Sequence, residues 1–419
     1  MSTLFFLFSL VVGWQAWNLY HPNFTHRRWS VASFFAGWLT GELALHVIFW
    51  QVLAVGFFVL VGAVWGFFGA LGFLICTTAW ATIAYYYYES TYAEAEVSLA
   101  LHSGLGAGFE SEIDESMRAR FPDEPDRNLI RHPFKLRDPE VETIRNIPYG
   151  DHRQTLDIRR SRFGDNDAKR PVLLQIHGGG WTERWGSKNE QGLPLMNHMA
   201  KRGWVCVANS YRLSPGATFP EHIIDCKQAL LWVKDHIAEY GGDPDFIMVT
   251  GGSAGGHLSS LLTLSANFPE FQPGAEDRDT SVQGCVPFYG VYDFTDAEGH
   301  YHHDGIIELL EDSMLKLRLS SNEESFKEAS PLHHISEAAP PFMVIHGDLD
   351  TLVPVESGRA FADKLIGVSN NPVVYLELAG AQHAFDVLPS VRSEHVKHGV
   401  EKFLAWNYSR YLAGKGSTS

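Results

Sequence analysis

The sequence predicts an α/β fold with a largely parallel sheet, preceded by a long apolar helical region. Three observations lead to this prediction. From residue 141 onward, short apolar runs alternate with helical patterns, which is the order that βαβ units produce. Two of the apolar runs end in glycine-rich turns, and residues 47–88 contain no charged side chain.

The uncharged run at 47–88 is too long for one membrane span. As a single helix its about 42 residues would reach roughly 63 Å, twice the hydrocarbon core of a bilayer. Glycines cluster near its middle, so we expect two spans, 47–64 and 66–85, joined by a tight turn. Residues 4–19 are a third apolar stretch without a basic n-region or cleavage site, which favours a retained short span over a signal peptide. A buried core hairpin is the alternative.

The basic residues Arg27 and Arg28 set the expected topology. They lie in the first loop and place it in the cytoplasm, because cytoplasmic loops are rich in Lys and Arg. Three spans then return the C-terminal domain to the cytoplasm, and the protein is expected to be integral to a membrane. Cleavage of residues 4–19, or a separate span at 31–50, would reverse the side.

Composition excludes two classes of protein. The net charge of −16, with no basic patch visible, argues against a nucleic-acid partner. The four cysteines show neither a disulfide pattern nor metal-ligand spacing, and the histidines at 300, 302 and 303 fit a polar lid loop better than a metal site. We therefore expect no metal and no organic cofactor.

The chain divides into three predicted regions. Residues 1–88 form the transmembrane region of about three spans. Residues 89–140, where charges and prolines return, are expected to be a linker and docking segment, with a packed helix at 93–100 as the alternative. Residues 141–419 form the α/β domain. An insertion at 292–339, with a helical pattern at 306–319, lies where a lid or substrate cap would be placed.

The α/β domain is predicted element by element. Strands are expected at residues 141–147, 155–158, 172–176, 205–209, 246–250, 282–288, 342–345 and 373–378, and helices at 193–202, 223–240, 256–266, 357–365 and 391–412. The first two strands are too close in sequence to enclose a helix. The sheet is therefore expected to begin antiparallel.

Ser253 has the setting of an activated nucleophile. It follows the apolar strand at 246–250 in the turn Gly251-Gly252-Ser253-Ala254-Gly255-Gly256 and precedes a helix. Small flanking residues such as Gly251 and Gly255 are needed because the strand turns sharply into the helix. The helix dipole favours negative charge beside the serine. A G-x-S-x-G sequence that marks only a turn is the alternative.

The turn His177-Gly178-Gly179-Gly180-Trp181 fits an oxyanion loop. It follows the apolar strand at 172–176, and its glycines allow backbone N–H groups to approach a carbonyl oxygen. The expected donors are Gly178, Gly179 and Ala254, with His177 and Gly180 supporting the turn. Loss of one such donor typically costs about 3 to 4 kcal/mol of transition-state stabilisation. A nucleotide-binding turn is the alternative, but the G-x-G-x-x-G spacing and its downstream acid are missing.

A serine nucleophile needs a base, and a histidine base needs an acid to orient it. Two later strands lead into suitable loops, His346-Gly347-Asp348-Leu349-Asp350 and Gly380-Ala381-Gln382-His383. We assign His383 as general base and acid and Asp350 as its orienter. Asp348 is the competing acid.

From about residue 140 to 412 the chain resembles the hormone-sensitive-lipase-like branch of α/β-hydrolase esterases. The residues that carry the resemblance are His177 to Trp181, Tyr211 to Pro215, Gly241 to Pro244, Gly251 to Gly256, Asp350 and His383. The resemblance implies an α/β-hydrolase fold and carboxylic-ester hydrolysis through an acyl-serine, with Ser253, Asp350 and His383 as the triad. Spans before such a domain are similar to those of membrane-associated carboxylesterases of actinobacteria.

Two positions depart from that family. It usually carries an acid before the serine and an asparagine after the second glycine, where this chain has Gly252 and His257. The turn at His177 to Trp181 also occurs in formamidases. The sequence thus predicts a membrane-anchored serine esterase or lipase acting on a hydrophobic ester. An amide or formamide hydrolase with the same triad and a catalytically silent, membrane-tethered binding protein are the alternatives.

Overall fold

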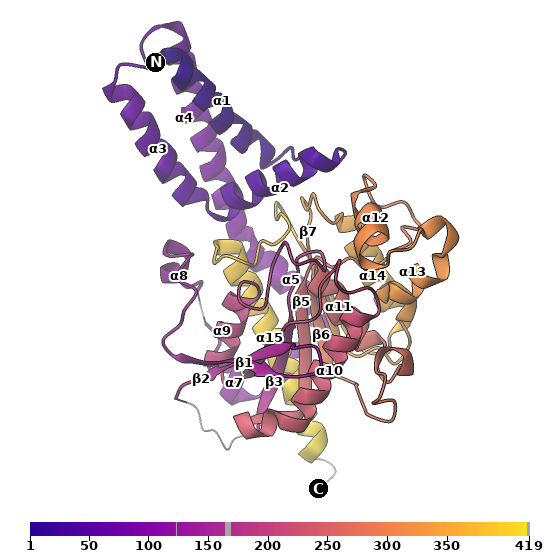
Figure 1. Cartoon of the computed structure of the whole chain (residues 1–419). Coiled ribbons are helices and arrows are strands. Elements are labelled where there is room, and N and C mark those ends of the chain that lie inside the picture. The colour runs from indigo at the N-terminus through magenta and orange to yellow at the C-terminus, as the bar shows by residue number, and fades with distance from the viewer. Residues whose placement is uncertain (123, 164–168, 417–419) are drawn as a thin grey trace.

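The computed structural model describes residues 1–122, 124–163 and 169–416. A helical bundle at the N-terminus stands on an α/β domain (Figure 1). The regions predicted at 89–140 and 141–419 are therefore described without residues 123, 164–168 and 417–419.

Four helices make up the N-terminal part, namely α1 (Ser2–Asn18), α2 (Arg27–Glu42), α3 (Ala44–Leu60) and α4 (Gly66–Glu89). α1, α3 and α4 run along the bundle, and α2 lies across its lower end next to the α/β domain (Figure 1). A bend of 95° separates α2 from α3. The turn expected in the glycine cluster is present, with Gly62 and Gly66 at φ +72° and +80°, values that other residues rarely adopt.

The bundle is apolar inside and outside. Phe5 and Val12 of α1 and Cys76 and Ile83 of α4 are buried, while the outer surfaces of α1, α3 and α4 expose many large apolar side chains. Among the described residues, one continuous helix, Gly66–Leu105, is long and apolar enough to cross a membrane. α2 and α3 together reach that length and apolar character only if the bent pair is counted as a single span. α1 and α3 have 17 residues each, about 25 Å, which is at the lower limit for a membrane span.

The segment predicted as a linker contains a helix that belongs to the α/β domain. α4 continues through a 3-10 turn (Ser90–Tyr92) into α5 (Ala93–Leu105). Val97 and Leu101 share one face of α5 and are buried against β8 and α15. At Gly104 an added Cβ would lie 2.6 Å from the Val373 carbonyl oxygen, so the helix approaches the sheet closely. Short helices α6 (Phe109–Glu112), α7 (Glu115–Arg118) and α8 (Arg127–Arg131) follow.

The sheet is mostly parallel and has the order β1-β2-β4-β3-β5-β6-β7-β8. The strands are β1 (Val141–Pro148), β2 (Thr155–Ser161), β3 (Arg170–Ile176), β4 (Val205–Asn209), β5 (Gly242–Gly252), β6 (Gly284–Phe288), β7 (Phe342–Gly347) and β8 (Val373–Leu378). The predicted antiparallel start is confirmed, since β2 pairs antiparallel with both β1 and β4. The remaining neighbours pair in parallel.

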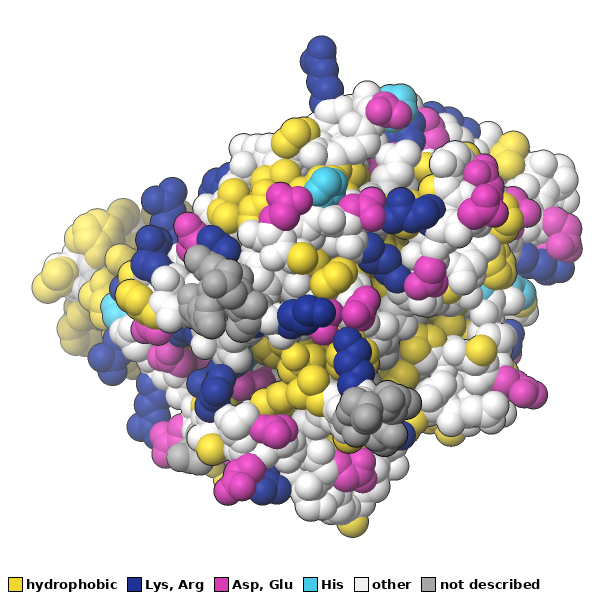
Figure 2. Space-filling view, turned by 90° about the horizontal axis from the view of Figure 1, so that it is seen from below, with side chains coloured by type: hydrophobic (Ala, Val, Ile, Leu, Met, Phe, Trp, Pro, Cys, Tyr) yellow, Lys and Arg dark blue, Asp and Glu magenta, His cyan; other side chains and the backbone are white. Residues whose placement is uncertain are grey.

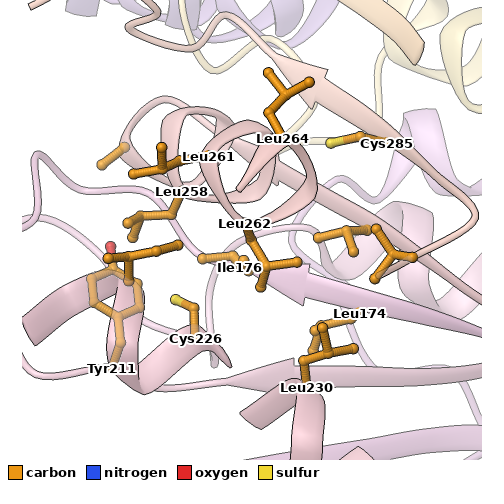
Figure 3. Close-up of a cluster of buried hydrophobic side chains, with 14 of the residues drawn as sticks. Leu174, Ile176, Tyr211, Cys226, Leu230, Leu258, Leu261, Leu262, Leu264 and Cys285 are labelled. Carbon is orange, nitrogen blue, oxygen red and sulfur yellow. The ribbon is translucent and has the colours of Figure 1, made fainter. Parts of the chain in front are cut away.

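Helices cover both faces of the sheet, as expected because β3, β4, β6 and β7 are buried at every position. They are α9 (Leu193–Lys201), α10 (Glu221–His236), α11 (Ala254–Leu264), α14 (Val355–Val368) and α15 (Val391–Gly416), all within a few residues of the predictions. Side chains of α10 and α11, including Leu230, Leu258 and Leu262, pack on Leu174 and Ile176 of β3 (Figure 3). All four cysteines are free and buried.

The insertion at 292–339 lies at the carboxyl end of the sheet, beside α2 (Figure 1). It contains α12 (Gly305–Leu309), a π-helical turn (Leu310–Met314) and α13 (Glu323–Ala329). The helix expected at 306–319 ends early, because Lys316 has a φ of +57° that a right-handed helix does not accommodate. The structure gives its histidines different partners, Glu298 for His300, Glu356 for His302 and Ser30 for His303.

Candidate active site

Ser253 lies at a strained turn between β5 and α11. Its φ of +58° and ψ of −122° lie outside the regions that ordinary residues favour. Close packing enforces the turn, since a Cβ on Gly255 would be 2.1 Å from the Ile176 carbonyl oxygen and one on Gly251 would be 2.4 Å from that of Gly255. The serine thus stands at the N-terminus of α11, where the helix dipole favours an anion.

The predicted oxyanion loop lies against this serine. A Cβ on Gly178 would be 3.1 Å from the Ser253 Cβ. The Gly178 N–H, one of the predicted oxyanion donors, donates to Gln191 Oε1 at 2.5 Å in this structure. The sequence could not place the Gln191 side chain there. Among the described residues, the N–H groups of Gly179 and Ala254 have no acceptor, and these two remain as candidate donors.

His177 packs against Tyr211 at the start of the oxyanion loop. Its ring stacks on that of Tyr211 at 4.5 Å, and the Tyr211 hydroxyl donates to the His177 carbonyl oxygen at 3.0 Å. The His177 Nδ1 lies 2.8 Å from the Gly178 carbonyl oxygen. Burial lowers the pKa of His177 to about 4, so the ring is neutral at pH 7. Its role is to shape the turn.

His257 ties the oxyanion loop to the insertion. Trp181 Nε1 donates to His257 Nδ1 at 3.1 Å, which leaves the proton of His257 on Nε2, 2.8 Å from the Ala329 carbonyl oxygen. Burial lowers the pKa of His257 to about 3, so the ring stays neutral with this single tautomer. His257, which stands where the family usually carries asparagine, therefore provides a contact to the insertion.

Asp350 and His383 form a buried pair, with Asp350 Oδ2 2.6 Å from His383 Nδ1. The other carboxylate oxygen accepts the N–H groups of Leu352 and Val353, each at 2.9 Å. Burial would raise the pKa of Asp350, but electrostatic attraction to His383 and hydrogen bonds from His346 and His383 outweigh this effect and hold the pKa below its usual value. Asp350 therefore remains ionised and orients His383.

The competing acid, Asp348, points elsewhere. Its Oδ1 accepts the Gly380 N–H at 2.7 Å. Both aspartates follow β7, and the geometry selects Asp350 as the partner of His383.

Tyr289 fills the corner between the serine turn and His383. Its ring lies 4.5 Å from the His383 ring, and a Cβ on Gly252 would be 2.8 Å from its hydroxyl oxygen. The hydroxyl donates to Asp386. Glycine at 252 thus leaves room for Tyr289, a residue that sequence reasoning did not identify. Among the described residues the Ser253 hydroxyl has no hydrogen-bond partner. The turn that holds Ser253 and the His383 ring thus border the same tyrosine, and no hydrogen bond joins Ser253 to His383.

The BD-FAE family model matches residues 156–365, which is half of the chain. The chain belongs to the BD-FAE family. The BD-FAE match runs from β2 to α14 and includes both glycine turns and Asp350, but it ends before His383.

Relatives of this BD-FAE chain are named as esterases. It is 54% identical over 271 residues to the probable carboxylic ester hydrolase LipM of Mycobacterium tuberculosis, covering 64% of this chain and 62% of LipM. It is 46% identical over 275 residues to Esterase LipQ of the same organism, covering 65% and 64%. The matches thus span just under two thirds of those relatives.

A solved structure shares the BD-FAE chain's fold. The propionate-bound esterase Est2 of Thermogutta terrifontis is 26% identical, with a TM-score of 0.51, and the alignment covers 67% of this chain and 96% of Est2. The α/β-hydrolase fold expected from the resemblance is supported by this neighbour and by the sheet order.

Proposed function

We propose that this chain is a membrane-anchored serine carboxylesterase that hydrolyses a hydrophobic ester through an acyl-serine intermediate. The observation that carries the proposal is the buried Asp350–His383 pair, which borders the same tyrosine ring as the turn holding Ser253. The names of LipM, LipQ and Est2 support ester hydrolysis.

The reaction follows from the placement of these groups. His383 takes the Ser253 hydroxyl proton on Nε2 while the serine oxygen bonds to the ester carbonyl carbon, and the carbonyl electron pair moves to its oxygen. The N–H groups of Gly179 and Ala254 stabilise this oxyanion. Asp350 keeps the other His383 proton on Nδ1 and stabilises the imidazolium. His383 then protonates the departing alkoxide, and water repeats the sequence to release the acid.

The membrane part of the proposal is supported by the surface of the bundle. Its helices expose large apolar side chains, among them Leu7, Trp17, Phe57, Leu60 and Phe67. The opposite end of the molecule carries Lys, Arg, Asp and Glu side chains of both signs, as a water-facing surface does (Figure 2). The bundle would therefore lie in lipid and the far face in water.

The side of the membrane is proposed from the first loop. Arg27 pairs with Glu308 of the insertion, so the basic end of α2 and the α/β domain are on the same side of the bundle. By the positive-inside rule that side is the cytoplasm. Protease added to intact cells should then leave the α/β domain uncut, and cleavage would reverse the assignment.

Ser253→Ala tests the mechanism. We expect it to abolish hydrolysis of p-nitrophenyl butyrate and labelling by a fluorophosphonate probe, since only an activated serine reacts with that probe. Ser103→Ala, at an exposed position on α5, is the matched control and should retain both. Turnover by Ser253→Ala would overturn the acyl-serine mechanism.

Two other results would favour the alternatives. A wild-type chain that the probe does not label would be a binding protein. Faster turnover of the amide in a matched ester and amide pair would make it an amidase.

A further inference from the structure

Helix α2 has its apolar face on the outside. The buried residues of this helix are mainly small or polar and include Ser30, Ser33, Gly37, Thr40 and Gly41, with Phe34 the one large apolar side chain among them. The exposed large apolar residues of α2 are Trp29, Val31, Phe35 and Leu39, with exposed fractions of 60%, 41%, 38% and 39%. A surface helix in water shows the reverse pattern. An apolar outer face beside two arginines suits a helix that lies in a membrane interface.

The inner face of α2 rests on the catalytic loops. The Phe34 ring lies 6.0 Å from the His383 ring in an edge-to-face arrangement. The Thr351 hydroxyl, next to Asp350, donates to the Ser30 carbonyl oxygen at 2.9 Å. A Cβ on Gly37 would be 3.1 Å from Gln382 Cγ. α2 is therefore a wall of the active site.

The N-terminal end of α2 is fastened to the insertion. Ser30 Oγ lies 3.0 Å from His303 Nε2, and Arg27 forms an ion pair with Glu308. Just before α2, the Phe24 ring packs on that of His302 at 5.5 Å. The wall is thus attached to both the catalytic loops and the insertion.

An aromatic rim joins the outer face of α2 to the oxyanion loop. The Phe35 ring lies 6.4 Å from that of Trp185, whose side chain is 56% exposed. The backbone of Trp185 touches the oxyanion loop, since a Cβ on Gly179 would be 2.3 Å from the Trp185 carbonyl oxygen. An exposed apolar pair therefore lies beside the oxyanion loop, where α2 meets the α/β domain.

We propose that α2 lies in the headgroup region of the bilayer and that Phe35 and Trp185 form the entry through which the hydrocarbon chain of a lipid ester leaves the membrane. Phe34 then lines the path to His383. The substrate class is an ester that resides in the bilayer. This inference rests on the proposed esterase function and adds the route and source of its substrate.

The test compares two esters on the full-length protein in phosphatidylcholine vesicles. One is p-nitrophenyl palmitate embedded in the vesicles and the other is p-nitrophenyl acetate in solution. Phe35→Ser should lower the palmitate-to-acetate ratio of kcat/KM at least tenfold, because the entry loses its apolar surface. Phe35→Leu keeps that surface and should restore the ratio.

Phe49→Ser is the matched control. It removes the same side chain from an exposed position on α3, at 56% exposure and away from the rim, and should keep the wild-type ratio. Fluorophosphonate labelling of each variant shows that the serine site is intact. An unchanged ratio in Phe35→Ser, or an equal fall in Phe49→Ser, overturns the entry. A wild-type chain that hydrolyses neither ester overturns the esterase function instead.

Discussion

Replacement of Glu42 by Gln should loosen α2 from the α/β domain. Glu42 is the last residue of α2, and its Oε1 lies 2.7 Å from Arg392 Nη1 while Oε2 accepts the Ser390 hydroxyl at 2.5 Å. Both charged side chains are 2% exposed. The pair joins the end of α2 to the start of α15.

The free-energy cost of Glu42→Gln comes from the Arg392 charge, which stays buried without its partner. Removing one partner of a buried ion pair typically costs about 3 to 5 kcal/mol, because the other charge stays buried without compensation. Gln retains the volume and an acceptor, and the Arg392 guanidinium still lies 5.2 Å from the centre of the Tyr86 ring, a cation–π contact that offsets part of the loss. We expect a net cost of about 2 to 3 kcal/mol. At about 1.4 kcal/mol per factor of ten, the detached state of α2 becomes roughly 30- to 140-fold more populated.

Hydrogen exchange measured by mass spectrometry on the full chain in micelles reports this population. The amides of α2 should exchange faster in Glu42→Gln by that factor. Glu124→Gln is the control, because it breaks an ion pair with Arg127 whose side chains are 69% and 83% exposed. Wild-type exchange of α2 in Glu42→Gln would refute the reasoning that this pair holds the helix down.

Three further outcomes are expected. Asp350→Asn should lower kcat for p-nitrophenyl butyrate by about 10⁴-fold, whereas Asp348→Asn, whose carboxylate binds a backbone N–H, should stay within about tenfold of wild type; equal losses would contradict the pairing. His257 is neutral with a pKa near 3, against about 6.5 when unfolded, so the unfolded chain binds the extra proton and stability present above pH 6.5 is lost as the pH falls. His257→Asn should therefore reduce the pH dependence of the unfolding free energy between pH 6.5 and 4 by about 1.4 kcal/mol per pH unit. Denaturant titrations at several pH values measure this dependence, and an unchanged dependence would disprove the assignment. Gly255→Ala should yield no folded protein, because its Cβ would overlap the Ile176 carbonyl oxygen, and recovery of a wild-type circular dichroism spectrum would show that the turn can relax.

The elements of the α/β domain could be predicted because their signals are local. Residues 172–176 of β3 and 246–250 of β5 are buried, mostly apolar and followed by glycine turns, and such patterns can be recognised within about ten residues. The order of the acid and base loops along the chain follows from the same pattern. Of the two acids that the sequence offers, Asp350 and Asp348, the structure brings Asp350 to His383.

The contacts that shape the site could not be predicted, because they join residues far apart in sequence. Ser30 meets Thr351 and Tyr289 meets Asp386 through side-chain and backbone groups that no periodicity links. The hydrogen bond from the Gly178 N–H to Gln191 could not be predicted for the same reason. Residues 27–42 mix serines with aromatic residues, so the sequence offers a span at 31–50 only as an alternative and does not predict a helix that lies across the end of the bundle.

The unbroken passage from α4 through Ser90–Tyr92 into α5 has a consequence for how this chain would meet its substrate. Because residues of α5 are buried in the core of the α/β domain, α4 is joined to that domain by a continuous helical segment and not by a flexible linker. On the membrane placement proposed above, the serine is held at one fixed height over the lipid. An ester bond reacts only if it reaches that height. The rigid connection would therefore select lipid esters by the distance between their carbonyl group and the hydrocarbon core of the bilayer.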